Sequence, residues 1–373
     1  MGDWEFQGRA GWADAATIVP WAIHESFGSL EVLRRQLPSM RRWVHALHNR
    51  RAGNPFLPTE FQFGDWCDPD APGDQPWKAK VSSDFVANAF FVRSARITAR
   101  VEALVGDPEQ EAFFTDLAEE LRKNLWAEFG ENAVTTTAGS AIALQFDIMP
   151  EEERERVAKN LAATVVRDRG AISTGFLGTP LILHALSQHG YWSEAYMMLL
   201  RQEIRSWLYQ VDSGATTIWE RWDAIGEDGS IHSGEMATEN EHQEEQSMIS
   251  FNHYAYGAVV DWMYRNVGGL APATPGYRDT AVCPAPIMGM THAMASIQTR
   301  FGRVASGWEI SADGLFVLDL TVPFGITAHL NLPITPDSTV IVDGQPAKNG
   351  DTVGHGHHQV SITQPRIISF EGR

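Results

Sequence analysis

The spacing of apolar residues changes once along this chain, and that change is the strongest constraint on its fold. Up to residue 267 the apolar residues recur at helical intervals, as in 111–129, where they are Phe113, Phe114, Leu117, Leu121, Leu125 and Phe129. Beyond the glycine- and proline-rich stretch 268–277, apolar residues alternate with polar ones, as in 316–322. A period near 3.6 indicates helices, whereas a period of two indicates strands. The sequence therefore predicts a helical region followed by a β region.

Residues 1–269 are predicted to form an α/α barrel. Segments with one apolar stripe, typical of outer helices, are 30–48, 81–105, 111–129, 152–166 and 190–207. Segments that are apolar on more than one side and rich in small residues are 14–27, 174–188 and 249–264. Such segments suit helices that pack against neighbours on both sides. An alternation of outer and inner helices is typical of a barrel built from helical hairpins.

The remaining chain is predicted to form a linker at 270–283 and a small antiparallel β-sandwich at 284–373. Apolar residues alternate with polar ones in 316–322 and 326–332, and Val340 and Val342 precede the turn residues Asp343 and Gly344. An Asp-Gly pair between alternating segments is a strong signal for a β-hairpin. We therefore expect an Asp343–Gly344 hairpin within this domain.

Composition excludes several classes of partner. The 373 residues carry a net charge of −18, with acidic runs at 109–111, 151–153 and 239–245 that we expect on helix surfaces or loops. A phosphate backbone would be repelled, so nucleic acid is not an expected partner. No apolar run reaches the roughly 18 residues of a membrane-spanning helix. The first residues show no secretory signal pattern. We expect a cytoplasmic protein without a membrane partner.

The two cysteines point to reduced thiols. Cys67 and Cys283 lie far apart in sequence, with neither CxxC spacing nor a histidine cluster beside them. That arrangement lacks the spacing of a metal site. We therefore expect no metal site at the cysteines.

Two short segments, 216–226 and 250–257, bring together residue types that suit sugar chemistry. Glu220 lies between Trp219 and Trp222, and the second segment contains His253. Indole faces stack on the C–H face of a pyranose, and a carboxylate among aromatic rings is suited to proton transfer. The structural alternative is a Glu–Arg pair at the start of a helix, with His253 as a core residue.

Two further loops contain tryptophans beside glycine and aspartate. In 11–21, Trp12 and Asp14 precede a predicted inner helix, and capping of that helix would be a sufficient reason for Asp14. In 63–69, Trp66 follows a Gly-Asp pair. The segment 172–180 has two glycines at the beginning of another predicted inner helix. A loop tryptophan either contacts a ligand or seals the loop against the core.

Together these segments resemble the family 78 glycoside hydrolases, the α-L-rhamnosidases, in order and in spacing. The resemblance implies a six-hairpin (α/α) barrel followed by a β-domain and an inverting mechanism. It implies that Glu220 is the general base. It also implies a substrate-binding set of Trp12, Asp14, Trp66, Trp219, Trp222 and His253. The segment 172–180 would cross the mouth of the barrel.

One family element has no counterpart in this sequence. The family's general acid is a glutamate in an Asp-Glu-Arg-x-Gly-Trp-x-Gly-Asp segment before the Trp12 motif, and Asp-Glu-Arg occurs nowhere in this chain. We therefore expect an incomplete barrel in which the usual acid segment is missing. Asp3 and Glu5 lie nearest to the place of an acid, but they match the family segment poorly.

The resemblance predicts hydrolysis of terminal α-L-rhamnosides of a glycoside or an oligosaccharide, a reaction that needs no metal and no organic cofactor. Two alternatives stay open: a non-catalytic or weakly active carbohydrate-binding remnant, and a glycosidase of the same fold with another specificity. An apolar flank exposed where helices are missing would favour a homo-oligomer.

Overall fold

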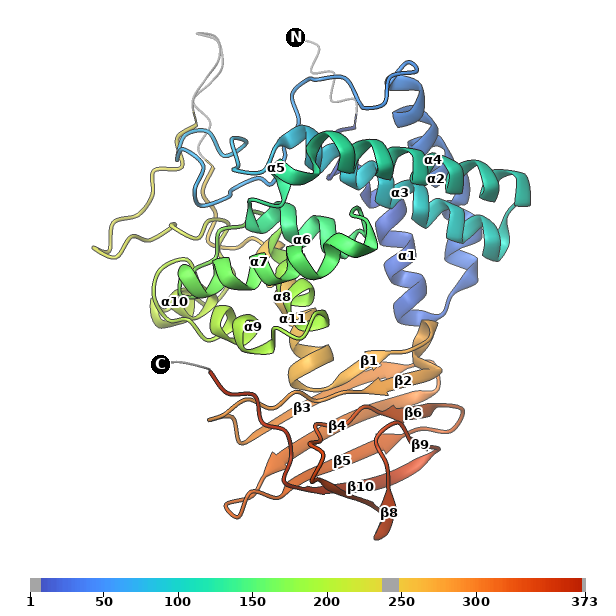
Figure 1. The fold of residues 1–373 in the computed structure, drawn as a ribbon, viewed down its shortest axis with the longest axis vertical. Helices are drawn as coiled ribbons and strands as arrows, with labels where there is room; N and C mark the ends of the chain where they lie inside the picture. Colours follow the sequence, from blue (N-terminus) through green and yellow to red (C-terminus); the bar gives the residue numbers. More distant parts are fainter. Residues whose placement is uncertain (1–7, 237–247, 371–373) are drawn as a thin grey trace. The chain divides into compact units, whose positions relative to one another are not determined.

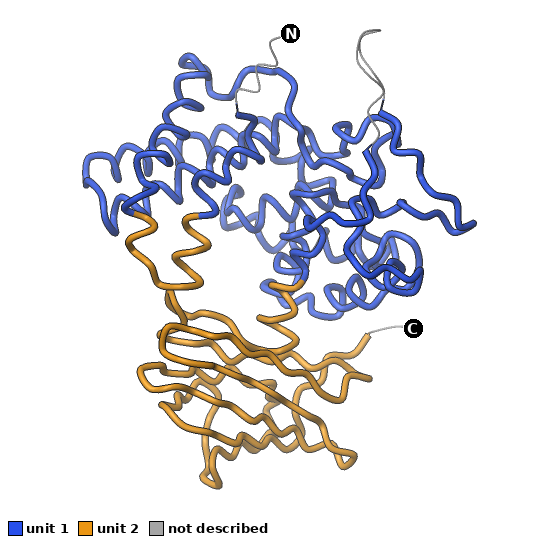
Figure 2. The backbone as a smooth tube through the Cα atoms, turned by 180° about the vertical axis from the view of Figure 1, so that it is seen from behind, with its two compact units in different colours: residues 1–19, 34–259 blue, residues 20–33, 260–373 orange. Residues whose placement is uncertain are grey.

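The computed structural model describes residues 8–236 and 248–370 of the chain. These residues form two compact units (Figure 2). The first unit takes the described residues within 1–19 and 34–259, and the second takes 20–33 and 260–370. Asp3, Glu5 and the acidic run 239–245 lie outside the described residues.

Helices make up most of the first unit, in the order that the apolar spacing predicts (Figure 1). Their bounds are α1 Ala15–Phe27, α2 Leu30–Arg50, α3 Ser83–Val105, α4 Pro108–Leu125, α5 Glu131–Ala133, α6 Thr137–Gln145, α7 Arg154–Arg167, α8 Thr179–Gln188, α9 Trp192–Leu199, α10 Trp207–Asp212 and α11 Val259–Trp262. Short 3-10 or π-helical turns are η1 Trp126–Gly130, η2 Glu151–Glu153, η3 Ala255–Ala258 and η4 Met263–Val267. The second unit takes the end of this series, namely α11 from Val260 onward and η4. It also takes the hairpin between α1 and α2.

Inner and outer helices alternate, but not with the predicted members: the segment 81–105, predicted as an outer helix, is an inner one, and α6 is not among the predicted helices. Helix α3 is buried along most of its length, and it packs against α4, which is buried along one stripe only. Helix α6 is likewise buried throughout and packs against α7, whose buried residues form one stripe. The pairing of a fully buried helix with a half-buried one confirms the predicted class of helical-hairpin fold.

Local sequence explains where α4 begins and ends. The side chain of Asp107 accepts hydrogen bonds from the amides of Glu109 and Gln110, and Pro108 occupies the first turn, where no amide is needed. Arg122 and Lys123 lie in the last turn, where cations offset the helix dipole. The predicted helix at 111–129 therefore starts earlier and gives way to the π-helical turn η1.

In the predicted helix 190–207, α9 ends at Leu199 and residues 200–206 are not helical. Two further segments predicted as helical are irregular because other parts of the chain bind their backbone. Helix α8 begins only at Thr179, since amides within 175–178 are bonded to Asp65. Residues 249–254 are not helical, since Ser250 and His253 form backbone hydrogen bonds with the segment 218–220. Both segments belong to the candidate site described below.

The second unit contains two β-sheets (Figure 1). The four-stranded sheet has the order β1-β2-β6-β9, with β1 Leu270–Pro272, β2 Asp279–Val282, β6 Thr327–Leu330 and β9 Thr352–Val353. The six-stranded sheet has the order β3-β4-β5-β10-β7-β8, with β3 His292–Thr299, β4 Gly302–Ile310, β5 Phe316–Val322, β10 Gly356–Thr363, β7 Thr339–Val342 and β8 Gln345–Ala347. The strands pair antiparallel except β2 with β6, which pair parallel.

A single core joins the two sheets, as a sandwich requires. Buried residues of both sheets contribute to it, among them Val282 and Leu330 from the smaller sheet and Leu318 and Val360 from the larger. The predicted hairpin is present: β7 and β8 pair around Asp343 and Gly344, which both have positive φ. Two successive positive φ values match the twist of a tight antiparallel hairpin.

The predicted linker at 270–283 is wrong for most of its length. Residues 270–272 and 279–282 are strands β1 and β2 of the four-stranded sheet, separated by the short turn η5 Pro275–Tyr277. Gly276 has φ +76°, and a Cβ there would lie 2.9 Å from the amide nitrogen of Gly28. The glycines thus serve a close backbone approach within a folded domain, which composition does not distinguish from a linker.

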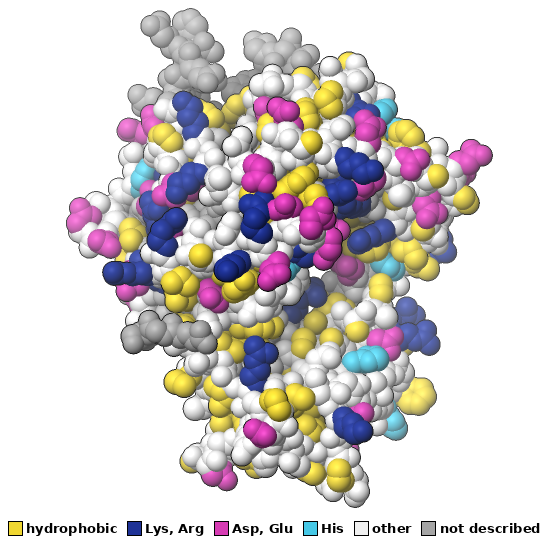
Figure 3. Space-filling model, in the orientation of Figure 1, with side chains coloured by type: hydrophobic (Ala, Val, Ile, Leu, Met, Phe, Trp, Pro, Cys, Tyr) yellow, Lys and Arg dark blue, Asp and Glu magenta, His cyan; other side chains and the backbone are white. Residues whose placement is uncertain are grey.

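Acidic and basic side chains are interspersed over the surface drawn in Figure 3. The predicted acidic runs 109–111 and 151–153 lie on or beside helices α4 and α7, as expected. Among the described residues, no helix combines the length and apolar character needed to cross a membrane.

Replacement of Leu318 by alanine tests the sandwich core. Leu318 is fully buried on β5, so Leu318→Ala should lower the free energy of unfolding of the second unit by about 2–5 kcal/mol. The matched control, Met294→Ala on β3, removes a side chain that is 75% exposed, and its effect should stay within ~0.5 kcal/mol. Urea denaturation followed by circular dichroism measures both. Equal effects of the two substitutions would contradict the assigned core.

Candidate active site

Glu220 and His253 are brought together by a short backbone pairing. The amide of Glu220 donates to the carbonyl of Ser250 over 2.9 Å, and the amide of His253 donates to the carbonyl of Ile218 over 2.8 Å. These bonds place Nε2 of His253 3.8 Å from Oε1 of Glu220. That separation is too long for a hydrogen bond but short enough for both groups to contact one small molecule. Glu220 is 9% exposed, so its carboxylate is largely shielded from water.

Phe176 covers one face of the His253 imidazole. Its ring stacks on His253, with centroids 4.8 Å apart and planes inclined by 25°. The amide of Phe176 donates to the carbonyl of Trp66 over 2.8 Å, so the segment 172–178 also contacts the Trp66 loop. Sequence analysis singled out the segment 172–180 but not Phe176 itself. The sequence signal that could have identified Phe176 was its position between Gly175 and Gly178.

Trp12 and Trp66 belong to one aromatic cluster. Phe63 contacts both: its centroid lies 4.7 Å from that of Trp12 and 5.4 Å from that of Trp66. Phe61 and Trp77 extend the cluster beyond Trp66. Trp12 is 36% exposed and Trp66 is half-buried, so both present ring surface. Through Trp66 this cluster is linked to Phe176 and His253.

Trp219 and Trp222 lie inside the protein. They are 3% and 1% exposed, respectively. The ring of Trp222 stacks on Tyr256 at 4.0 Å, and its indole N–H donates to the carbonyl of Thr174 over 3.1 Å. Trp219 packs edge-on against Phe251. In this structure both indoles therefore pack against protein, and their predicted contact with a sugar stays a prediction.

Asp14 is also fully buried, directly before α1. Its carboxylate accepts hydrogen bonds from the amide of Gly11, the indole of Trp43 and the hydroxyl of Ser94. Burial raises its pKa, and these three bonds oppose the rise. The carboxylate thus fixes the loop that carries Trp12. Its predicted contact with substrate is untested and remains a prediction.

Arg221 is occupied by partners other than Glu220. Its guanidinium binds both carboxylate oxygens of Asp223, over 3.0 and 3.3 Å, and donates to the carbonyl of Gly73. The structural alternative of a direct Glu220–Arg221 pair is therefore replaced by an Arg221–Asp223 pair. The side chain of Glu220 is left near His253.

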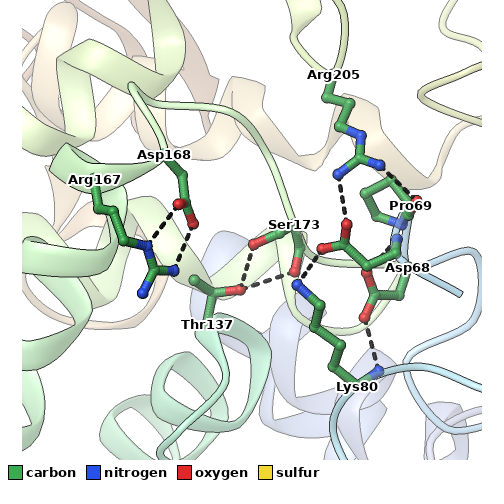
Figure 4. Close-up of polar contacts among 9 residues, drawn as sticks. Asp68, Pro69, Lys80, Thr137, Arg167, Asp168, Ser173 and Arg205 are labelled. Atoms are coloured by element: carbon green, nitrogen blue, oxygen red, sulfur yellow. Dashed lines mark hydrogen bonds and ion pairs between the residues drawn. The ribbon is translucent and has the colours of Figure 1, made fainter.

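Ionic and polar contacts hold the loop 68–80 and the chain around Ser173, which follow and precede residues of the candidate site (Figure 4). Asp68 accepts hydrogen bonds from the amides of Asp70 and Lys80, so it closes the loop 68–80 on itself. Arg205 binds the carboxylate of Asp70 over 2.6 Å and the carbonyl of Pro69 over 2.9 Å. In the neighbouring segment, the hydroxyl of Thr137 on α6 donates to the carbonyl of Ser173. These contacts give both loops a fixed geometry.

The arrangement suits proton transfer to a small polar molecule beside aromatic rings. A shielded carboxylate can activate water, an imidazole can donate to or accept from a hydroxyl, and indole surface can contact an apolar ring face. Among the described residues, no group of three or more His, Cys, Asp or Glu side chains is placed to hold a metal ion.

Family models match nearly the whole chain. Residues 1–267 match the bacterial alpha-L-rhamnosidase 6 hairpin glycosidase domain, and residues 269–345 match the bacterial alpha-L-rhamnosidase C-terminal domain. Among curated proteins, an alpha-L-rhamnosidase of Formosa agariphila is 33% identical over 98% of this chain and 39% of its own length. One of Streptomyces avermitilis is 33% identical over 95% of this chain and 33% of its own.

Solved structures agree with these matches. The crystal structure of Streptomyces avermitilis alpha-L-rhamnosidase complexed with L-rhamnose superposes with a TM-score of 0.82 at 32% identity, over 95% of this chain and 33% of the other. The native alpha-L-rhamnosidase from Aspergillus terreus gives a TM-score of 0.82 at 31% identity, over 95% and 39%. The chain thus spans between a third and two-fifths of the length of these relatives.

Substitution of Gly175 tests the packing of the site loops. A Cβ on Gly175 would lie 2.2 Å from the carbonyl oxygen of Asp65 and 2.3 Å from that of Trp66. Because both atoms are backbone, Gly175→Ala should force the loops apart and lower the free energy of unfolding by about 1–3 kcal/mol. In the control Gly257→Ala, the new Cβ meets its nearest atom, Cγ1 of Ile218, at 3.6 Å, so stability should change by no more than ~0.5 kcal/mol.

Thermal and urea denaturation measure both variants. If Gly175→Ala is as stable as Gly257→Ala, the close approach of the two loops is not present in solution.

Proposed function

Since this chain belongs to the bacterial α-L-rhamnosidase family of six-hairpin glycosidases, we propose that it hydrolyses terminal α-L-rhamnosides, with Glu220 as the general base. The observation that carries the proposal is the pairing of a shielded Glu220 with His253, 3.8 Å apart, with the ring of Phe176 stacked on the imidazole. The rhamnose complex of the Streptomyces relative supports a terminal rhamnose as the recognised group. The substrate would be a rhamnose-containing glycoside or oligosaccharide.

The proposed reaction inverts the anomeric carbon. One carboxylate removes a proton from a water that attacks the sugar, while a carboxylic acid on the opposite face protonates the departing oxygen, the two groups standing roughly 6.5–9.5 Å apart. Glu220 takes the first role, because its side chain is left free of Arg221. The proposal assigns the second role to no residue of this sequence.

The remaining side chains orient the sugar. Trp12 and Trp66 offer ring surface to the C–H face of rhamnose, as indoles do in sugar sites. His253, held in place by its stack on Phe176, donates to or accepts from a sugar hydroxyl. Asp14, Trp219 and Trp222 support these residues from the interior, and any direct sugar contact by the three would follow a movement of the loops.

Glu220→Gln tests the proposed base. The amide keeps the size of the side chain but cannot accept the proton of water, so turnover of a nitrophenyl α-L-rhamnoside should fall by at least about 10²-fold. An activated aryl leaving group suits this test, because its departure needs little protonation. Binding of L-rhamnose, measured by titration calorimetry, should change little. The control Glu128→Gln removes an exposed carboxylate on η1 and should keep the activity of the unmodified chain.

The outcomes separate the candidate functions. Full activity of Glu220→Gln would contradict the role of Glu220. Rhamnose binding without any turnover by the unmodified chain would favour a carbohydrate-binding role instead. Turnover of other aryl glycosides but not of the rhamnoside would favour a glycosidase of another specificity.

A further inference from the structure

Asp65 is a completely buried carboxylate that binds a segment far from it in sequence. Its Oδ2 accepts from the amide of Gly175 over 2.7 Å, and its Oδ1 accepts from the amides of Leu177 and Gly178, each over 2.8 Å. Its exposed fraction is 0%. All three donors are backbone amides, so the bonds fix the path of the main chain through 175–178. Hydrogen bonds to an ionised acceptor are the stronger kind.

The loop that contains Asp65 and Trp66 packs closely against the segment 175–178. Gly175 has space for no Cβ, because the carbonyl oxygens of Asp65 and Trp66 lie against it. A Cβ on Gly178 would lie 2.9 Å from Cβ of Ala138 and 3.0 Å from Oδ2 of Asp65. The carboxylate is therefore enclosed by the backbone that it binds.

The bound segment carries a residue of the site. Phe176 lies between Gly175 and Leu177, and its ring stacks on His253. Its amide donates to the carbonyl of Trp66, the residue that follows Asp65. Four consecutive amides, from 175 to 178, are thus bound by two consecutive residues of the other loop, Asp65 and Trp66. A shift of this segment would move Phe176 away from His253.

We propose that Asp65 is a positioning residue: it fixes Phe176 against His253 and sets the place of Trp66 in the same contact. The role in sugar binding rests on the function proposed above, whereas the fixing of 175–178 does not. Asp65 touches no substrate in this account and acts through Phe176 and His253.

The raised pKa of Asp65 agrees with a carboxylate that orders the backbone of 175–178 rather than one that stabilises the folded chain at neutral pH. Burial raises its pKa to about 6, the Asp68 carboxylate adds to the rise, and the bound amides oppose it. Cys67 and Tyr256 also interact electrostatically with Asp65. Because this pKa exceeds the usual 3.8, the stability gained by protonating Asp65 is present at low pH and is lost as the pH rises through about 6. The ionised form, which accepts all three bonds, is lost as the pH falls through about 6.

The test compares Asp65→Asn with a matched control, Asp68→Asn. Both carboxylates are buried and accept from backbone amides, but Asp68 binds only Asp70 and Lys80 within its own loop. An asparagine at position 65 presents an NH2 group where one oxygen had accepted, so at least one amide loses its partner. Hydrogen–deuterium exchange, read by mass spectrometry well above pH 6, reports on the amides of 175–178.

Asp65→Asn should speed exchange in 175–178 by about tenfold or more, as expected for the loss of one hydrogen bond to a charged group. It should also weaken binding of L-rhamnose by about tenfold, while lowering the urea midpoint no more than Asp68→Asn does, because both variants leave a buried amide without its acceptor. Asp68→Asn should leave the exchange in 175–178 as it is in the unmodified chain, because Asp68 accepts no hydrogen bond from these amides.

Unchanged exchange in 175–178, or equal exchange in the two variants, would overturn the proposal. Should Asp65→Asn fail to fold, exchange of the unmodified chain on the two sides of pH 6, corrected for the intrinsic rate, decides instead: protection confined to 175–178 should fall on the acid side. If the unmodified chain binds no rhamnose, the proposed function fails and the exchange result still decides whether Asp65 fixes the segment. If rhamnose binds and Asp65→Asn loses protection without losing affinity, the positioning role in sugar binding is wrong.

Discussion

The pairing of residues 218–220 with 250–253 is the constraint on which the candidate site depends. Two backbone hydrogen bonds, Glu220 to Ser250 and His253 to Ile218, place a carboxylate and an imidazole side by side although they are 33 positions apart in the chain. The same pairing prevents a helix from forming over 249–254. Because backbone atoms form this pairing, the fold sets the relative position of residues 220 and 253 whatever their side chains are.

Buried polar groups fix two other loops of the candidate site. Asp14 fixes the Trp12 loop and Asp65 fixes the segment that carries Phe176, each by accepting several hydrogen bonds without exposure to water. A buried carboxylate costs free energy unless it is fully hydrogen-bonded. Its presence in both loops therefore indicates that the site needs each loop held in one conformation. Trp222 contributes in a similar way, since its indole bonds Thr174 and covers Tyr256.

Much of the fold followed from the period of the apolar residues, which predicted the long helices such as α3 and the strands around the Asp343–Gly344 hairpin. Among the exceptions are two segments whose backbone is bound by distant residues: 174–178 and 249–254 have helical composition, but Asp65 and the 218–220 segment bind their backbone. Within the site, short motifs identified Glu220 and His253. Sequence could not show that Trp219 and Trp222 turn inward, or that Phe176 covers His253, because side-chain direction depends on these long-range contacts.

If Glu220, His253, Trp12 and Trp66 form one sugar site, a crystal structure of the chain soaked with L-rhamnose will show the sugar there. A rhamnose ring should lie against Trp12 or Trp66, with a hydroxyl in hydrogen-bond contact with His253. The Glu220 carboxylate should face the anomeric carbon across a space that holds a water molecule. Rhamnose bound beyond the reach of Glu220 and of both indoles, or a Glu220 carboxylate bonded only to protein while the sugar is bound, would contradict it.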